Sequence, residues 1–372
     1  MTCGSEHLGI YDLDAYHYDL PEPLIAQTPA VPRDAARLLV WRVSGGLDGI
    51  EHRVFADVID YLRPGDLLVL NDTKVLPARL RGVRAGSRDG GKAEILLLSP
   101  VSSDFEQWRA LARPGRRLGI GSEVMVGGRV LTIVGEEKDG VKVVLVGTGR
   151  EDVLSFLDEH GIMPLPPYIK NINADPASTR RDYQTVFALH GGSAAAPTAG
   201  LHFTEELLRR VEERGVEIAY VTLHVGLGTF RPVKSSDIRQ HNIHSEYCDV
   251  PDVTEAAVRA CRARRGRIVA VGTTVVRTLE SMAAADGTVK SGFMDTALFI
   301  YPGFPYKVVD ALITNFHLPG SSLLMLVSAF VNYLEGGRRE EAALESLRKI
   351  YSIAVSEEYR FFSFGDAMYI EK

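Results

Sequence analysis

The chain has 372 residues and a formal net charge of −6 at pH 7, with 45% hydrophobic and 24% charged residues. At roughly 150 residues per domain, this length predicts two or three globular domains. The acidic balance argues against a protein that is basic throughout, such as a nucleic-acid coat protein, but not against a local basic surface. Three cysteines without a CxxC pair indicate a reducing cytoplasm, and neither a signal peptide nor a membrane-length apolar span is expected.

Up to residue 75 the chain mixes extended and helical patterns, and the apolar run "LLVL" at 67–70 is typical of a buried strand. Between 76 and 149, short runs such as "AEILLLSPV" and "RVLTIVG" are separated by Gly, Asp and Lys turns, which predicts a small β-barrel or sandwich. From about residue 180 the pattern becomes strand–loop–helix. Several of its strands are continuous apolar runs, as expected when both faces of a sheet are covered.

The stretch "SAAAPTAGLHFT" at 193–204 precedes a predicted helix with Thr204 as its N-cap and Gly215 beyond its end. Small residues here allow the backbone to approach a ligand closely, and the N–H groups of a first helical turn favour anions. The stretch therefore predicts either a binding loop that carries His202 as an acid or base, or merely a tight turn.

Polar residues follow four predicted strands at the point where each strand ends. If these strands are mostly parallel, the polar groups gather at one edge of the sheet, where open α/β sheets bind ligands. Each group also has a simpler interpretation as a turn or a helix N-cap. The groups are Asn71, Asp72 and Thr73; His224, Gly226 and Gly228; Gly272, Thr273 and Thr274; and His317, Pro319 and Ser321.

Two other features carry charge. "HNIHSEY" brings His241, His244 and Glu246 together, but no cysteine pair or HExxH motif accompanies them, so we expect no metal site. "WRALARPGRRLG" and "VRACRARRGR" concentrate arginines, which are interpreted either as solvated faces or as parts of a basic surface.

A series of longer motifs occurs in a characteristic order: "NDTKVLPARL", "AAPTAGLHFT", "TLHVGLGTFRPV", "HSEY", "AVGTTVVRTLE", "ITNFHLP" with "SSLLMLVSAF", and "YRFFSFGDAM". Together they resemble, over nearly the whole chain, the S-adenosylmethionine:tRNA ribosyltransferase-isomerase family of queuosine biosynthesis. The resemblance implies an α/β main domain with a mixed, largely parallel sheet, formed by residues 1–75 and 150–372. It also implies a small β-barrel domain inserted at 76–149.

The resemblance further implies an enzyme that transfers and isomerises the ribosyl group of S-adenosylmethionine onto 7-aminomethyl-7-deazaguanine at the tRNA wobble position. The product is epoxyqueuosine, and adenine and methionine are released. S-adenosylmethionine is then a co-substrate, so no metal or resident cofactor is implied. We expect a cytoplasmic monomer whose partners are S-adenosylmethionine and the tRNA anticodon loop, and no membrane.

Such a reaction needs a base for the C5′ proton that the sulfonium acidifies and an acid for the departing adenine. We expect His202 to be the base, because the dipole of the following helix N-terminus favours a neutral imidazole. His224 and His317 are the competing bases. Asp72 is the candidate acid, or a partner for the ribose hydroxyls.

The other candidate residues are predicted to bind substrates. Threonines with backbone N–H groups, supported by Arg277, suit the methionine carboxylate, and the basic residues suit RNA phosphates. The substrate-binding set is Thr198, Gly200, Gly226, Gly228, Thr273, Thr274, Arg277 and Asn315. The RNA-binding set is Arg109, Arg113, Arg116 and Arg117 on the inserted domain, with Arg262, Arg264 and Arg265 elsewhere.

Two other function classes stay open on the sequence. An S-adenosylmethionine-dependent RNA methyltransferase would give methylated RNA and no free adenine, and it usually has an early Gly-rich strand–helix turn that this chain lacks. A non-catalytic RNA-binding protein would leave the four polar strand ends without a purpose.

The sequence departs from the family pattern at Ala36, where a serine is usual, and at Gly320 and Ser322, where a basic residue and a threonine are usual. It also departs from the pattern at Phe364, where a tyrosine is common.

Overall fold

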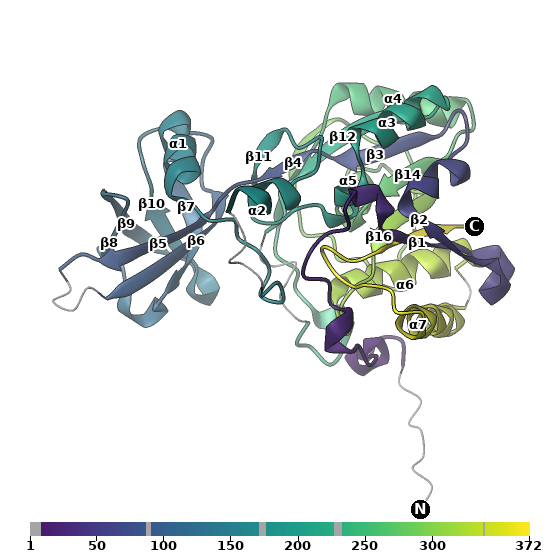
Figure 1. Ribbon diagram of the computed structural model, residues 1–372, viewed down its shortest axis with the longest axis horizontal. Helices are drawn as coiled ribbons and strands as arrows, with labels where there is room; N and C mark the ends of the chain where they lie inside the picture. The colour runs from purple at the N-terminus through teal and green to yellow at the C-terminus, as the bar shows by residue number, and fades with distance from the viewer. Residues whose placement is uncertain (1–8, 87–90, 171–175, 227–232, 338) are drawn as a thin grey trace, which may run out of the picture.

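The computed structural model describes residues 9–86, 91–170, 176–226, 233–337 and 339–372. They form an α/β main domain with a β-barrel beside it (Figure 1). No helix within these ranges combines the length and the apolar character needed to cross a membrane.

The main domain is built on a nine-stranded sheet in the order β15-β13-β12-β3-β14-β16-β17-β1-β2. Its central strands β12, β3, β14 and β16 pair in parallel, and antiparallel pairs flank them. This arrangement confirms the expected mixed sheet. The bounds are β1 Arg37–Arg42, β2 Ile50–Val54, β3 Leu67–Asn71, β12 Glu217–Leu223, β13 Glu246–Val250, β14 Ile268–Val271, β15 Gly292–Thr296, β16 Ala311–Asn315 and β17 Ala367–Glu371.

Helices and turns cover both faces of this sheet. In β3, Leu67 and Val69 belong to one hydrophobic core and Leu68 and Leu70 to the other, because successive side chains of a strand point to opposite faces. The first core also contains residues of α4–α7, and the second contains residues of α3 and of the 3₁₀ turn at 55–61. The bounds are α3 Glu205–Glu213, α4 Asp252–Ala263, α5 Thr273–Ser281, α6 Ser322–Leu334 and α7 Glu340–Ser356.

The helix predicted after Thr204 is α3. The Thr204 hydroxyl accepts a hydrogen bond from the Leu207 N–H at 3.1 Å, and Gly215 beyond the helix end has a φ of +81°. A side-chain cap at the start and a left-handed glycine at the end are the two signals that the sequence carried.

The barrel closes in the order β10-β7-β6-β5-β8-β9, with antiparallel neighbours throughout. All of these strands lie within the predicted insertion. The helix α1 (Arg150–His160) follows the predicted boundary at 149, yet its Val153 and Leu157 pack into the barrel core. The bounds are β5 Arg79–Arg84, β6 Lys92–Pro100, β7 Gln107–Arg113, β8 Glu123–Val126, β9 Arg129–Glu136 and β10 Lys142–Leu145.

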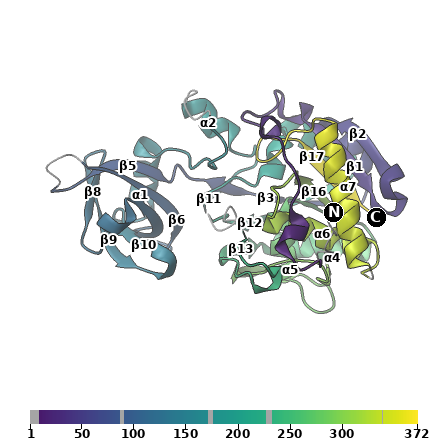
Figure 2. The same ribbon diagram turned by 90° about the horizontal axis from the view of Figure 1, so that it is seen from below.

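Two short strands connect the barrel to the main domain. β4 (Thr73–Val75) leaves directly after β3, and β11 (His190–Ser193), which follows the barrel in the sequence, pairs with it and runs in the same direction. Figure 1 shows both strands between the two domains, and Figure 2 shows β11 there from another side. The barrel is therefore attached at the edge where the central strands of the sheet end.

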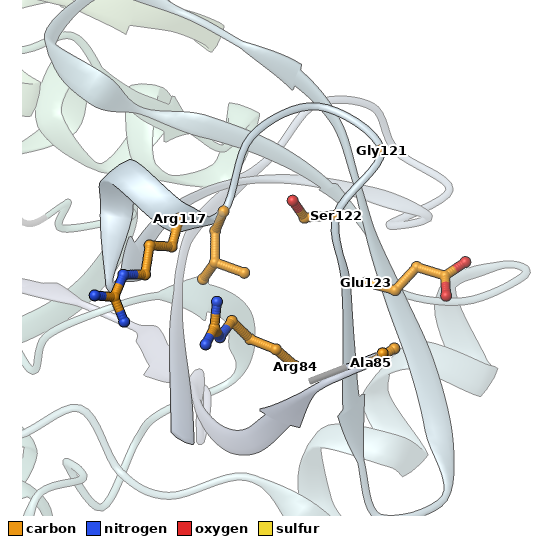
Figure 3. A pocket seen from close by; sticks show the side chains of 8 residues that line it. Arg84, Ala85, Arg117, Gly121, Ser122 and Glu123 are labelled. Carbon is orange, nitrogen blue, oxygen red and sulfur yellow. The ribbon is translucent and has the colours of Figure 1, made fainter. Parts of the chain in front are cut away.

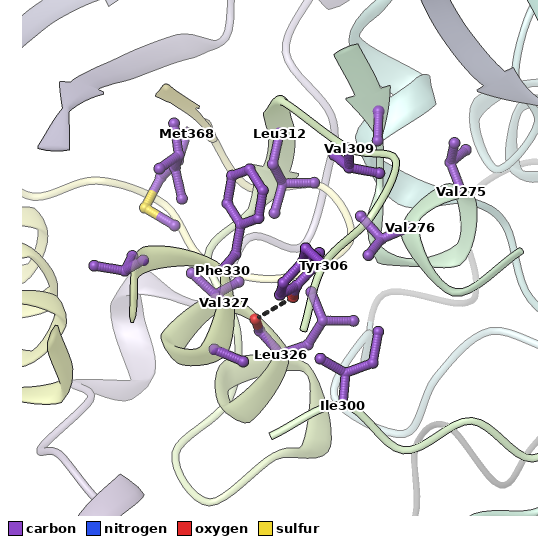
Figure 4. Close-up of a cluster of buried hydrophobic side chains, with 14 of the residues drawn as sticks. Val275, Val276, Ile300, Tyr306, Val309, Leu312, Leu326, Val327, Phe330 and Met368 are labelled. Atoms are coloured by element: carbon purple, nitrogen blue, oxygen red, sulfur yellow. Dashed lines mark hydrogen bonds between the residues drawn. The ribbon is translucent and has the colours of Figure 1, made fainter. Parts of the chain in front are cut away.

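The larger core lies under α6, where Phe330 is fully buried and meets the ring of Tyr306 edge-on at 5.2 Å (Figure 4). The Tyr306 hydroxyl donates a hydrogen bond to the Leu326 carbonyl at 3.0 Å. Burying an aromatic ring while its polar tip keeps a partner is how such residues stabilise a core.

We expect Phe330→Ala to lower the free energy of unfolding of the main domain by about 3–5 kcal/mol, because it removes a buried ring and leaves a cavity. Urea-induced unfolding followed by circular dichroism measures the change. Val253→Ala, at a side chain that is 76% exposed, is the control and should stay within about 0.5 kcal/mol of the wild type. Equal losses in the two variants would contradict this account of the core.

Candidate active site

The central strands bring the polar residues that follow them to one edge of the sheet. β3 ends at Asn71, β12 at Leu223, β14 at Val271 and β16 at Asn315, and these strands are parallel neighbours. This is the shared edge that the sequence led us to expect. The side chains form separate hydrogen-bonded groups along it.

The first group surrounds Asn315. Its side-chain oxygen accepts a hydrogen bond from the Thr198 hydroxyl at 2.8 Å. Its amide nitrogen lies 3.2 Å from the His202 Nε2 and 3.2 Å from the Phe362 carbonyl oxygen. Asn315 thus ties the loop that carries Thr198 and His202 to the end of β16.

His202 is enclosed in this group, with only 4% of the residue exposed. Its ring packs against the Phe55 ring, with 4.8 Å between their centres. Burial is the main cause that lowers the pKa of His202 to about 3, and the positive charges of Arg360 and Arg33 lower it further. The imidazole is neutral as expected, but the reason is desolvation rather than the dipole of α3.

Close packing explains the small residues around His202. A Cβ atom on Gly200 would lie 2.9 Å from the Phe187 ring, and one on Gly272 would lie 3.6 Å from the Ala199 Cβ. Gly272 also has a φ of +91°, a conformation that favours glycine. The stretch at 193–204 therefore packs against the start of α5. A side chain at Gly200 would meet the Phe187 ring, whereas at Gly272 the backbone conformation favours glycine.

The second group surrounds Asn71. Its amide nitrogen donates to the Leu223 carbonyl and to the Thr274 hydroxyl, both at 3.1 Å. Its side-chain oxygen accepts from the N–H groups of Thr73 and Leu223, also at 3.1 Å. The Thr73 hydroxyl in turn lies 2.8 Å from the His224 Nδ1. Asn71 therefore fixes the ends of β3 and β12 against the first turn of α5.

His224 is half-buried, and among the three candidate histidines it is the most exposed. Burial lowers its pKa to about 4, with smaller contributions from His190 and Arg150. At neutral pH this imidazole is uncharged, which is the form that accepts a proton.

A row of stacked rings extends from His224 across the flank of the sheet. The rings of His224 and Tyr247 lie 5.5 Å apart at an angle of 20°, and those of Tyr247 and Phe293 lie 6.1 Å apart at 23°. Tyr247 is 39% exposed and Phe293 is 74% exposed. Exposed aromatic faces on a sheet next to a polar edge suit the stacking of a planar group.

Asp72 lies beside the second group and is 5% exposed. Its carboxylate accepts a hydrogen bond from the Thr222 hydroxyl at 2.6 Å and lies 3.6 Å from the His190 Nε2. Burial is the main cause that raises the pKa of Asp72, and a raised pKa favours a carboxyl that can donate a proton.

Arg277 is buried against Glu246, with which it forms an ion pair. The Glu246 carboxylate also accepts a hydrogen bond from the Gly226 N–H at 2.8 Å. The charge of Arg277 is thus already compensated within the chain, and the pair holds the start of the loop after β12. Gly228, also predicted to bind substrate, lies outside the described residues.

His317 lies at the same edge but faces the other core. Its ring Nε2 lies 2.8 Å from the Thr314 hydroxyl, and its backbone N–H donates to the Tyr351 hydroxyl at 3.1 Å. Burial lowers the pKa of His317 to about 3. Because Thr314 and Asn315 are consecutive in β16, their side chains point to opposite faces, and His317 is separated by the sheet from His202.

Thr273 begins α5 and is largely buried beside Thr274, whose hydroxyl is hydrogen-bonded to Asn71.

Gly320, where the family pattern usually has a basic residue, has a φ of +66°, and a Cβ there would lie 3.2 Å from the His17 ring. A glycine therefore suits the local backbone at that position.

The predicted RNA-binding arginines fall into two places. Arg109, Arg116 and Arg117 lie on the barrel, where Arg109 pairs with Glu137 at 3.0 Å. Arg264 and Arg265 follow α4 and precede β14, so they lie at the edge of the sheet opposite the polar strand ends. The Arg264 guanidinium group donates hydrogen bonds there to the Glu217 carboxylate at 2.9 Å and to a backbone carbonyl.

Among the described residues, no three His, Cys, Asp or Glu side chains form a cluster that could hold a metal ion. A pocket of about 380 Å³ lies on the barrel, and a cavity of about 10 Å³ lies beside Arg277. Neither of the two is lined by His202, His224, Thr273 or His317, so these residues share a sheet edge but neither of these two pockets.

Sequence reasoning missed three residues at this site. Tyr247 belongs to the "HSEY" motif, and Phe293 is the aromatic residue of the short strand "GFMDT", so the sequence carried a signal for both. His190 left none, because its approach to Asp72 depends on the pairing of β4 with β11 across the inserted barrel.

The sequence profile of a family described as "Queuosine biosynthesis protein" matches residues 13–370. The chain belongs to this family. It is 51% identical to the S-adenosylmethionine:tRNA ribosyltransferase-isomerase of Moorella thermoacetica and 50% identical to that of Symbiobacterium thermophilum. Each alignment covers 96% of this chain and 99% of the relative.

A solved structure is also similar to this family member. It is the S-adenosylmethionine tRNA ribosyltransferase of Thermotoga maritima, which is 37% identical, with a TM-score of 0.53 over 96% of this chain and 99% of that one. The relatives and the fold therefore agree over the main domain and the barrel together.

The burial of His317 predicts a pH-dependent stability. The pKa of His317 is about 3 in the folded chain, below its ordinary value of about 6.5. Between these two pKa values the unfolded chain binds more protons at this histidine than the folded chain does. The free energy of unfolding therefore decreases as the pH falls below about 6.5.

As the pH falls below 6, we expect the free energy of unfolding of the wild type to decrease faster than that of His317→Gln. The difference between the two should change by up to about 1.4 kcal/mol per pH unit. Urea unfolding at pH 7, 6, 5 and 4.5 measures it. A difference that does not vary with pH would show that His317 titrates alike in both states.

Proposed function

We propose that this chain transfers and isomerises the ribosyl group of S-adenosylmethionine onto 7-aminomethyl-7-deazaguanine at the wobble position of a tRNA, releasing adenine and methionine. The observation that carries the proposal is the family match at residues 13–370 with full-length relatives of that named activity. The convergence of Asp72, His224 and Thr273 at one sheet edge supports it.

The geometry favours His224 over His202 as the base that removes the C5′ proton. His202 is enclosed, and its Nε2 is held by Asn315, whereas His224 is half-buried at the end of β12. In the tautomer in which Nδ1 donates to Thr73, the His224 Nε2 carries the lone pair that accepts a proton. His202 then acts through Asn315 and Thr198 as a positioning residue.

Asp72 suits the role of the acid that protonates adenine, because burial raises its pKa. The backbone N–H groups at the start of α5, next to Thr273 and Thr274, suit the donor carboxylate. Arg277 supports this site through Glu246 and Gly226, since its charge is already paired.

The stacked rings of Tyr247 and Phe293 suit the planar acceptor base once it leaves the anticodon loop. Bases that undergo chemistry are drawn out of their stack, and aromatic side chains compensate for the lost stacking. The row begins at His224, so a base stacked along it lies next to the proposed site of proton removal.

The partners of the proposed reaction are S-adenosylmethionine and a tRNA anticodon loop. The absence of a resident cofactor, the monomeric state and the cytoplasmic location stay predictions of the sequence.

The decisive measurement is adenine release when the protein is mixed with S-adenosylmethionine and a tRNA that carries the aminomethyl base. We expect adenine and no methylated RNA. A methyltransferase would give the reverse result, and a non-catalytic RNA-binding protein would give neither product.

We expect His224→Gln to reduce single-turnover adenine release at least roughly a hundredfold, which is the scale of general-base loss. His52→Gln is the control, because His52 lies on β2 and is bonded to Tyr359. A large loss in His202→Gln with near-normal turnover in His224→Gln would return the role of base to His202.

We expect Phe293→Ala to raise the KM for the modified tRNA about tenfold with little change in kcat, since one stacking contact is worth about 1–3 kcal/mol. Met294→Ala is the matched control, because the next residue of β15 points to the other face of the sheet. Steady-state adenine release measures both constants, and equal KM values for the two variants would reject the stacking role.

A further inference from the structure

The barrel carries a pocket of about 380 Å³ that belongs to no part of the site described above. Arg84 and Arg117 line it, with Ser122 and Glu123 on the opposite wall (Figure 3). Arg84 ends β5, whose first residue, Arg79, forms a backbone bridge with Ile162 next to the linker. The pocket is therefore a strand length, roughly 17–20 Å, beyond the linker.

The two guanidinium groups in this pocket lack an acidic partner among the described residues. The Glu123 carboxylate points away from them (Figure 3). The Nε of Arg84 is buried without a hydrogen-bond partner.

Two other arginines of the same domain are paired with carboxylates, although the Nε of Arg79, at the start of β5, is also buried without a partner. Arg81 lies 3.4 Å from Glu94, and Arg129 lies 2.6 Å from Asp152. A buried donor without a partner is costly, and a bound ion or water is one way to satisfy it. In contrast to Arg79, Arg84 lines a pocket that an anion can enter.

A bound anion would account both for the two guanidinium groups without acidic partners and for the unpartnered Nε of Arg84. Two like charges that line one pocket repel each other unless a negative group lies between them. The planar fork of a guanidinium matches the oxygens of a phosphate, so two forks from different strands can hold one phosphate. The volume falls in the range of roughly 300–1,000 Å³ that is usual for ligand sites and accommodates a phosphate with its sugar.

We propose that this pocket binds one backbone phosphate of the tRNA, at a point remote from the wobble base. The inference rests on the proposed function, which supplies an RNA as the anionic partner. Arg116, exposed next to Arg117 on the same 3₁₀ turn, extends the positive charge beyond the pocket. Because the pocket is far from the polar strand ends, the contact positions the RNA and takes no part in the chemistry.

The test is the affinity of the full-length protein for the modified tRNA as a function of salt. We expect Arg84→Ala and Arg117→Ala each to raise the Kd roughly tenfold at 0.1 M salt. The slope of log Kd against log salt should fall by about one in the double variant, and kcat at saturating tRNA should be unchanged.

The matched control is Arg81→Ala, which removes the same charge from the same strand but at an arginine already paired with Glu94. Arg117 is exposed, so its substitution does not endanger the fold. A wild-type slope in both pocket variants, or an equal effect in Arg81→Ala, would overturn the phosphate site while leaving the proposed function intact.

A wild-type protein that neither binds nor modifies the tRNA would instead overturn the proposed function. Titration with inorganic phosphate separates a site for a small anion from a site for RNA. Phosphate binding that depends on Arg84, combined with a wild-type affinity for tRNA in Arg84→Ala, would reject the RNA phosphate as the ligand.

Discussion

The candidate site depends on one buried amide. Asn71 uses both of its N–H groups and both of its oxygen lone pairs, and the partners come from β12, β4 and α5. A buried polar side chain is favourable only when it is satisfied in this way, and it then fixes its partners in one arrangement. His224 and Thr274 take their positions from this arrangement, and so does the departure of the chain toward the barrel.

Burial determines the charge state of the site. His202, His224 and His317 are kept neutral chiefly because they are desolvated, so the edge offers uncharged imidazoles at neutral pH. Arg277 is buried at this edge, and its charge is neutralised by the ion pair with Glu246. The three imidazoles and the paired Arg277 therefore add no net positive charge that would repel a sulfonium donor.

The periodicity of the sequence was sufficient to predict the central strands β3, β12, β14 and β16, the β-rich texture of the barrel, α3 with its cap, and the single edge at which the polar residues gather. It was not sufficient to predict which face of the sheet each side chain takes. Thr314, which bonds His317, and Asn315, which bonds His202, are consecutive residues and point to opposite faces. Nor could it predict contacts such as that of His190 with Asp72, which join segments separated by the whole barrel.

The place of the insertion gives the barrel its role. A domain inserted at the opposite edge of the sheet would be remote from the strand ends, whereas β4 and β11 attach this one directly after Asn71. An RNA held by the barrel is therefore delivered to the edge that carries His224 and the stacked rings. Because the chain is acidic overall, its attraction for RNA has to come from local sites where arginines lack acidic partners, and the pocket of Arg84 and Arg117 is such a site.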